Sequence, residues 1–172
     1  MAKFKIIGMM ALIAFAMGIV LAGDAFAQQK TLKEQLVGTW TLVSNNNVAP
    51  DGTKRQLFGP DPKGIVIYDA NGRYAQFMVN PNRPKFKGKT RLDGTPEENK
   101  AVVQATSAHF GTWSVNEADK TLIYHTEFHI WPNDDGKELK RSITLTGDEL
   151  KVFNPTPAGG SGTAELLWKR AK

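Results

Sequence analysis

Residues 139–153 read LKRSITLTGDELKVF, two runs of alternating side chains on either side of a Gly-Asp pair. In the first run, Leu139, Ile143 and Leu145 share one face of an extended chain, while lysine, serine and threonine side chains share the other. Gly147-Asp148 suits a two-residue hairpin turn of the Gly-first type. The stretch therefore predicts two antiparallel strands, 138–146 and 149–154, with one face directed into a core.

Similar β-rich runs separated by turn residues fill most of the chain. One segment departs from this pattern, because Thr95-Pro96-Glu97-Glu98 combines a capping residue, proline at the first helical position and a glutamate three residues after the cap, which predicts a short helix. Short strands joined mainly by hairpins favour an all-β fold, an antiparallel barrel or sandwich, over a βαβ sheet. The further strands are expected at 38–44, 64–68, 73–80, 109–116, 121–131 and 163–170.

The composition limits both the domain count and the chemistry. A chain of 172 residues with 41% apolar and 23% charged residues is typical of one compact globular domain and excludes disorder throughout. Cysteine is absent, which excludes disulfides, thiolate metal sites, a catalytic cysteine and a lipid-bearing cysteine anchor.

Residues 1–27 have the three-part pattern of a secretory signal peptide. Two lysines precede an apolar run that ends near Ala25-Phe26-Ala27, a small-x-small cleavage site. The alternative is a membrane anchor, but the run is interrupted by glycines and is shorter than the ~20 residues that a span requires. We expect cleavage after Ala27 and a soluble, secreted or periplasmic domain at 28–172, whose net charge is +4 because the leader removes two lysines and one aspartate from the total of +5.

Arg141 falls on the apolar face of its run, so an inward guanidinium would need acceptors. If the hairpin formed by residues 121–146 turns about Asp134, Glu127 lies opposite Arg141 and His125 lies nearby on the same interior face. A one-residue slip would instead place Thr126 or Phe128 opposite Arg141. The first register predicts an interior cluster of carboxylate, guanidinium and imidazole.

The start of the first strand and several later stretches resemble a known family. Gly38-Thr39-Trp40 looks like the Gly-x-Trp motif of lipocalins, whose tryptophan packs against a late basic residue, and Arg170 matches that barrel-closing role beside Trp40. The Thr-Asp-x-x-Tyr signature of classical lipocalins is missing. The chain more closely resembles the bacterial lipocalin-like domain family, in residues 36–44, 58–64, 67–68, 109–113, 124–127 and 166–170.

This resemblance implies a calycin-type small barrel: an antiparallel eight-stranded lipocalin-like β-barrel with one short helix, an internal cavity and a core at 36–170. It implies no established reaction, because fold alone does not choose a function.

The leading functional hypothesis is binding of a small hydrophobic or amphipathic molecule in the barrel lumen, without catalysis or a cofactor. Arg141 would bind a carboxylate or carbonyl of the ligand, beside His125 and Glu127. The alternative without a ligand is a purely structural salt bridge between Glu127 and Arg141. The apolar wall would come from Trp113, Tyr68 and Leu166.

The same residues leave two other functions open. An isomerase or cyclase could use His125 as a base oriented by Glu127, although the sequence has no nucleophile elbow, phosphate loop or dinucleotide fingerprint. A structural or interaction barrel with a filled core is the third hypothesis. A metal is not predicted, because His125 and His129 are too far apart on one strand to share an ion without a further ligand such as His109.

The densest basic run, from Arg83 to Arg91, also has two interpretations. In an exported protein of charge +4 nucleic acid is not expected, and a solvated loop that could flap over one barrel mouth is the default. The alternative, in which the loop has a binding role, is weak contact with an anionic membrane surface or an acidic headgroup. The sequence leaves the oligomeric state open. The basic residues are Arg83, Lys85, Lys87, Lys89 and Arg91.

Overall fold

The computed structural model describes residues 30–160 and 162–172 and contains one antiparallel sheet that closes on itself. The predicted signal peptide, 1–27, lies outside the described residues. The elements are α1 Leu32–Leu36, β1 Gly38–Val48, β2 Lys54–Arg55, β3 Lys63–Tyr68, β4 Arg73–Val79, η1 Arg91–Asp93, α2 Pro96–Gln104, β5 Thr106–Asn116, β6 Thr121–His129, η2 Pro132–Asp134, β7 Glu138–Thr146, β8 Glu149–Asn154 and β9 Thr163–Arg170.

Eight of the strands form the barrel, and each pairs with its neighbour along the chain. The order is β1-β3-β4-β5-β6-β7-β8-β9, and β9 pairs with β1 to close the sheet, while the two-residue β2 extends from the end of β1. Closure leaves no long edge strand exposed among these eight. The predicted eight-stranded antiparallel barrel is confirmed.

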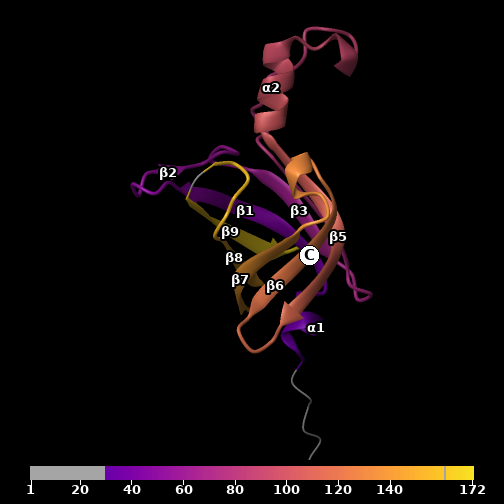
Figure 1. Cartoon of the computed structure of the whole chain (residues 1–172), viewed down its shortest axis with the longest axis vertical. Coiled ribbons are helices and arrows are strands. Elements are labelled where there is room, and N and C mark those ends of the chain that lie inside the picture. Colours follow the sequence, from indigo (N-terminus) through magenta and orange to yellow (C-terminus); the bar gives the residue numbers. More distant parts are fainter. Residues whose placement is uncertain (1–29, 161) are drawn as a thin grey trace, which may run out of the picture.

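The two ends of the barrel differ. Tight turns at residues 69–72, 117–120 and 147–148 lie at one end together with α1, and we call this the closed end. The connections 49–62, 80–105, 130–137 and 155–162 lie at the other, which we call the open end. In Figure 1 the segment that carries α2 projects from the open end, away from the barrel.

Local sequence explains the two elements that were easiest to predict. Gly147, at φ +57°, makes the tight turn between β7 and β8, as the alternating runs on either side predicted. The capping box of α2 is also present, because the Thr95 hydroxyl accepts from the Glu98 amide and the Glu98 carboxylate accepts from the Thr95 amide. Among the described residues, neither α-helix is long and apolar enough to cross a membrane.

Large aromatic side chains pack the closed end. Trp40 and Trp168 are fully buried, and the indole N–H of Trp40 donates to the Leu36 carbonyl at 2.9 Å. The Arg170 guanidinium lies 4.2 Å from the centre of a Trp40 ring and donates to the carbonyls of Val37 and Gln35. These contacts fix α1 across the barrel and seal this end.

The predicted register of β6 against β7 is wrong. Leu122, and not Glu127, lies opposite Arg141, and the connection between the strands is a long loop containing η2 rather than a tight turn about Asp134. Burial explains the outcome, because Leu122 and Tyr124 form the more apolar face of β6 and both enter the core. The opposite face of β6 therefore points to water.

Two β-bulges interrupt the alternation of inward and outward side chains. In β1 the extra residue is Val43, so Leu42 points inward and the next inward positions are Asn45 and Asn47. In β6 the extra residue is Glu127, so Thr126 and His129 point inward while the two residues between them point out. Each bulge thus directs polar side chains into the barrel toward its open end.

Candidate functional site

A cavity of about 650 Å³ opens at the open end of the barrel. This volume is typical of sites that hold a small molecule, which measure roughly 300–1,000 Å³. Its wall combines apolar residues with a small set of polar side chains. The apolar part includes Leu57, Phe58, Met78, Leu139, Val152, Ala164 and Leu166, and the polar part includes Asn45, Asn47, Gln76, His109, Tyr124, His129 and Arg141.

Arg141, from β7, is the buried cation of this cavity. Its residue is 9% exposed, and its guanidinium donates to the backbone carbonyl of Lys140 at 2.7 Å. Among the described residues, no carboxylate lies within ion-pair distance of Arg141. Burial lowers the pKa of Arg141, although an arginine stays charged at any physiological pH. A buried cation without an anionic partner is costly, so an anion that enters this cavity meets a site prepared for it.

His109, from β5, is fixed between two neighbours. Its Nδ1 lies 2.9 Å from the Tyr74 hydroxyl and its Nε2 lies 2.8 Å from the Gln76 side-chain nitrogen. Burial, followed by the nearby His129 and Arg141, lowers the pKa of His109 to about 3. The imidazole is therefore neutral at physiological pH, and both of its nitrogens are already engaged.

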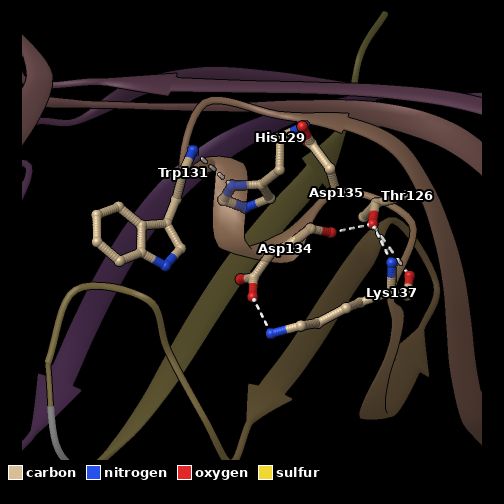
Figure 2. Close-up of polar contacts among 6 residues, drawn as sticks. All are labelled: Thr126, His129, Trp131, Asp134, Asp135 and Lys137. Atoms are coloured by element: carbon tan, nitrogen blue, oxygen red, sulfur yellow. Dashed lines mark hydrogen bonds and ion pairs between the residues drawn. The ribbon is translucent and has the colours of Figure 1, made fainter.

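His129, which the bulge in β6 turns inward, is held by the loop that follows it (Figure 2). The Trp131 amide donates to His129 Nδ1 at 2.9 Å, and the His129 amide donates to the Asp135 carboxylate at 2.6 Å. Burial lowers the pKa of His129. Because Nδ1 accepts a hydrogen bond, the neutral ring carries its proton on Nε2, which makes Nε2–H a hydrogen-bond donor.

The same loop is tied to the barrel by Thr126 and Lys137. The Thr126 hydroxyl donates to the carbonyls of Asp134 and Lys137, and the Lys137 ammonium lies 3.2 Å from the Asp134 carboxylate (Figure 2). The rings of His109 and His129 stack with centroids 5.1 Å apart. The loop therefore holds one imidazole against the other at the wall of the cavity.

The tyrosines near the cavity keep their protons. Tyr68 and Tyr124 share a hydrogen bond between their hydroxyls, and burial raises the pKa of Tyr124 to about 12. Burial also raises the pKa values of Tyr68 and Tyr74. With these tyrosines protonated and His109 neutral, the wall offers the Arg141 cation, several neutral hydrogen-bonding groups, and the Asp134 carboxylate, which pairs with Lys137. Such a set suits recognition of an anion better than removal of a proton, which needs a base with a pKa nearer to neutral.

The structure separates the residues that the sequence grouped together. Arg141 and Leu166 line the cavity, whereas Tyr68 and Trp113 are buried in the packed core and are not among its lining residues. The predicted interior position of His125 and Glu127 is wrong, because both side chains point outward from β6.

On the outer wall the two residues have other partners. Glu127 accepts two hydrogen bonds from the Arg73 guanidinium, one of them at 2.9 Å, and this contact lowers the pKa of Glu127. His125 Nδ1 lies 3.7 Å from a Glu138 carboxylate oxygen. The carboxylate that was expected beside Arg141 thus serves a surface ion pair.

Sequence reasoning assigned no ligand-binding role to four residues that line the cavity: His109, His129, Asn45 and Asn47. The sequence carries no signal for the inward position of His129, because it depends on a one-residue bulge, which has no compositional mark. Within residues 30–160 and 162–172, no group of three or more histidine, aspartate or glutamate side chains is placed to hold a metal.

Comparison with known families agrees with this architecture. A family model described as a lipocalin-like domain matches residues 37–171, which include the whole of the barrel. A search of curated proteins returns no match. The first residue of the match directly precedes β1, and its end follows β9. The chain therefore belongs to the lipocalin-like domain family.

Proposed function

We propose that this barrel binds a small amphipathic molecule whose carboxylate reaches Arg141 and whose hydrocarbon part fills the cavity. The observation that carries the proposal is the buried Arg141 guanidinium, which lines a cavity and has no carboxylate partner among the described residues. The lipocalin-like barrel is a ligand-binding fold, and the apolar part of the wall supports an aliphatic ligand. A carboxylate would receive charge-assisted hydrogen bonds from the guanidinium there.

The position of the carboxylates argues for binding over catalysis. The isomerase or cyclase alternative required His125 and Glu127 inside the lumen, and both lie on the outer wall. Asp134 is the one carboxylate among the lining residues, and it pairs with Lys137. The filled-core alternative is disfavoured by the size of the cavity.

The test is the affinity for dodecanoic acid, measured by calorimetry on residues 28–172. Arg141→Met removes the cation and keeps most of the aliphatic volume, so we expect the affinity to fall at least about 30-fold, as when one partner of a buried charge pair is lost. The free energy of unfolding should not fall, because the unpaired buried charge is removed with it.

The matched control is Arg73→Met, which removes an arginine from the outer wall and should leave the affinity unchanged. Equal affinity of wild type and Arg141→Met would refute the proposal.

We also propose that the protein is exported and that a basic arm beside the open end contacts an anionic lipid surface. The basic arm, residues 81–93, contains five basic residues and one acidic residue, a net +4. Residues 28–172 as a whole also carry +4, so the rest of the domain is neutral. Leu92, in the arm, is 87% exposed. Concentrated positive charge beside an exposed apolar side chain is the combination that favours an anionic membrane surface.

The arm is also placed to link such a surface to the cavity. It connects through α2 to the cavity rim, where Val103 and Gln104 are among the lining residues. The Glu98 carboxylate accepts from the Lys87 amide at 3.0 Å, which ties the arm to α2. No salt bridge is found for the five basic side chains of the arm within the described chain, so their charges are available to a partner.

Co-sedimentation with phosphatidylcholine vesicles, with and without about a third of phosphatidylglycerol, tests this contact. Binding should need the anionic lipid, should weaken as salt is added, and should be lost when the five basic residues of the arm become glutamine. Equal loss in a control with the same net charge would overturn it, since that would show a dependence on total charge only. The control carries glutamine at five lysines at or near the closed end: Lys30, Lys33, Lys120, Lys169 and Lys172.

A further inference from the structure

We infer that the cavity has a second polar subsite, formed by Asn45 and Asn47, which accepts a hydrogen bond from a hydroxyl group on the ligand. The inference rests on the proposed function, because it assumes that a carboxylate occupies Arg141. It adds a ligand class, since a molecule that satisfies both places is a hydroxylated amphipathic acid rather than a plain fatty acid.

The first observation is that two amide oxygens in the cavity wall have no partner. The Oδ1 atoms of Asn45 and Asn47 are buried and make no hydrogen bond with the described residues. Asn45 is 5% exposed, and its side-chain nitrogen has only a long contact, 3.8 Å, with the sulfur of Met78. Buried polar atoms in proteins are nearly always paired, and leaving one unpaired costs about 1–3 kcal/mol. Two such atoms on one strand of a ligand cavity therefore point to a partner from the ligand.

The second observation is the bulge that places these residues in the lumen. If β1 continued past Leu42 without a bulge, strict alternation would direct Ser44 and Asn46 inward. The bulge directs Asn45 and Asn47 inward instead. Bulges commonly redirect side chains next to functional sites. The chain thus departs from regular strand geometry at the point where it delivers both carboxamides to the cavity.

The third observation is the position of this subsite relative to the cation. Three strands separate β1 from β6 in either direction around the barrel, so Asn45 and Asn47 lie on the wall opposite His129. Arg141 lies on β7, next to β6. One wall therefore offers a cation and a donor imidazole, and the opposite wall offers amide oxygens. A ligand that spans the cavity would be an acceptor at one end and a donor at the other.

The donor on the ligand is a hydroxyl rather than an ammonium. An ammonium group would be repelled by the Arg141 guanidinium in the same cavity, where burial strengthens charge interactions. A hydroxyl donates without adding charge. Its hydrogen bond to a previously unpaired amide oxygen would also remove a cost that the free protein carries.

The experiment compares four probes on residues 28–172: dodecanoic acid and its 2-hydroxy, 3-hydroxy and 12-hydroxy derivatives. We expect at least one hydroxy acid to bind about tenfold more tightly than dodecanoic acid, as one well-formed hydrogen bond allows. Asn45→Leu and Asn47→Leu should abolish this preference, so that each variant binds the four probes with equal affinity. Asn46→Leu, which alters the neighbouring outward residue, is the matched control and should keep the preference.

Arg141→Met separates this inference from the proposed function. It should weaken all four probes alike and preserve the preference for the hydroxyl. If the four probes bind wild type equally and Arg141→Met still weakens them, the Asn45 and Asn47 subsite is refuted while the carboxylate site stands. Insensitivity of all four probes to Arg141→Met would instead refute the proposed function.

The melting temperature distinguishes a ligand-binding role of Asn45 from a structural one. If Asn45 stabilised the fold, replacing it would lower the melting temperature. If both asparagines serve the ligand, Asn45→Leu should not lower the melting temperature, because it replaces an unpaired polar group with an apolar one. Should Asn45→Leu fail to fold, Asn45→Ala and Asn47→Leu provide the same affinity comparison. A hydroxyl preference that survives in the asparagine variants would overturn the inference.

Discussion

His109 shows how the cavity keeps its polar wall without adding charge. The Tyr74 hydroxyl and the Gln76 side chain each contact one ring nitrogen, and the residue is only 7% exposed. Because protonation would break this arrangement and bury a second cation near Arg141, the neutral ring is strongly favoured. Among the described residues Arg141 is thus the one buried basic side chain that is charged at neutral pH, which is why we propose an anionic ligand.

The lowered pKa of His109 predicts how the stability of the protein depends on pH. The pKa of His109 is about 3 in the folded protein and near 6.5 when the ring is exposed in the unfolded chain, so the unfolded chain binds the proton first as the pH falls. The stabilisation due to neutral His109 is complete above about pH 6.5 and is lost progressively toward pH 3. Urea unfolding at several pH values should show a decline that His109→Gln reduces by an amount on the order of a few kcal/mol. Identical pH profiles for the two proteins would contradict this assignment.

At the scale of elements, the two bulges determine which polar residues enter the lumen. The bulge in β6 depends on a close approach of backbones, because a Cβ added at Gly111 would lie 2.0 Å from the His125 carbonyl oxygen and 2.9 Å from the Glu127 nitrogen. Only glycine fits beside this bulge without moving a strand. The position of His129 in the cavity therefore rests on a glycine in the neighbouring strand.

Gly111→Ala should accordingly destabilise the barrel by at least about 3 kcal/mol, measured as the free energy of unfolding in urea. Gly136→Ala is the control: its φ of +69° favours glycine, but nothing lies within 4 Å of an added Cβ, so the cost should be about 1 kcal/mol. Similar costs at the two positions would show that the close approach is not a constraint.

The contrast between elements explains what could be predicted from the sequence. The β7–β8 hairpin and α2 were predictable because their turn and cap residues are local, and the strands were predictable from alternating hydrophobicity. The register of β6 against β7 was not, because the loop between them is long and both faces of β6 carry polar groups. His125 and Glu127 were therefore assigned to the wrong face, and the bulge that brings in His129 left no trace in composition.

At the scale of the whole molecule, the closed end of the barrel is sealed, and the open end gives access to the cavity. Trp40, Trp168 and Arg170 close one end, while the long connections surround the cavity at the other. The net charge of the domain is concentrated in the basic arm, which projects from the open end (Figure 1). This polarity agrees with a protein that meets an anionic surface and a small amphipathic acid at the same end.

We propose above all that the acid group of the ligand lies inside the cavity, at the buried guanidinium of Arg141, and not at the rim. A crystal structure of residues 28–172 with bound dodecanoic acid tests it most directly. The carboxylate should lie within hydrogen-bond distance of the Arg141 guanidinium, with the alkyl chain along the wall that contains Leu139 and Leu166. A ligand bound in the reverse direction, with its carboxylate in solvent beside Trp131 or the basic arm and its alkyl chain against Arg141, would contradict the account.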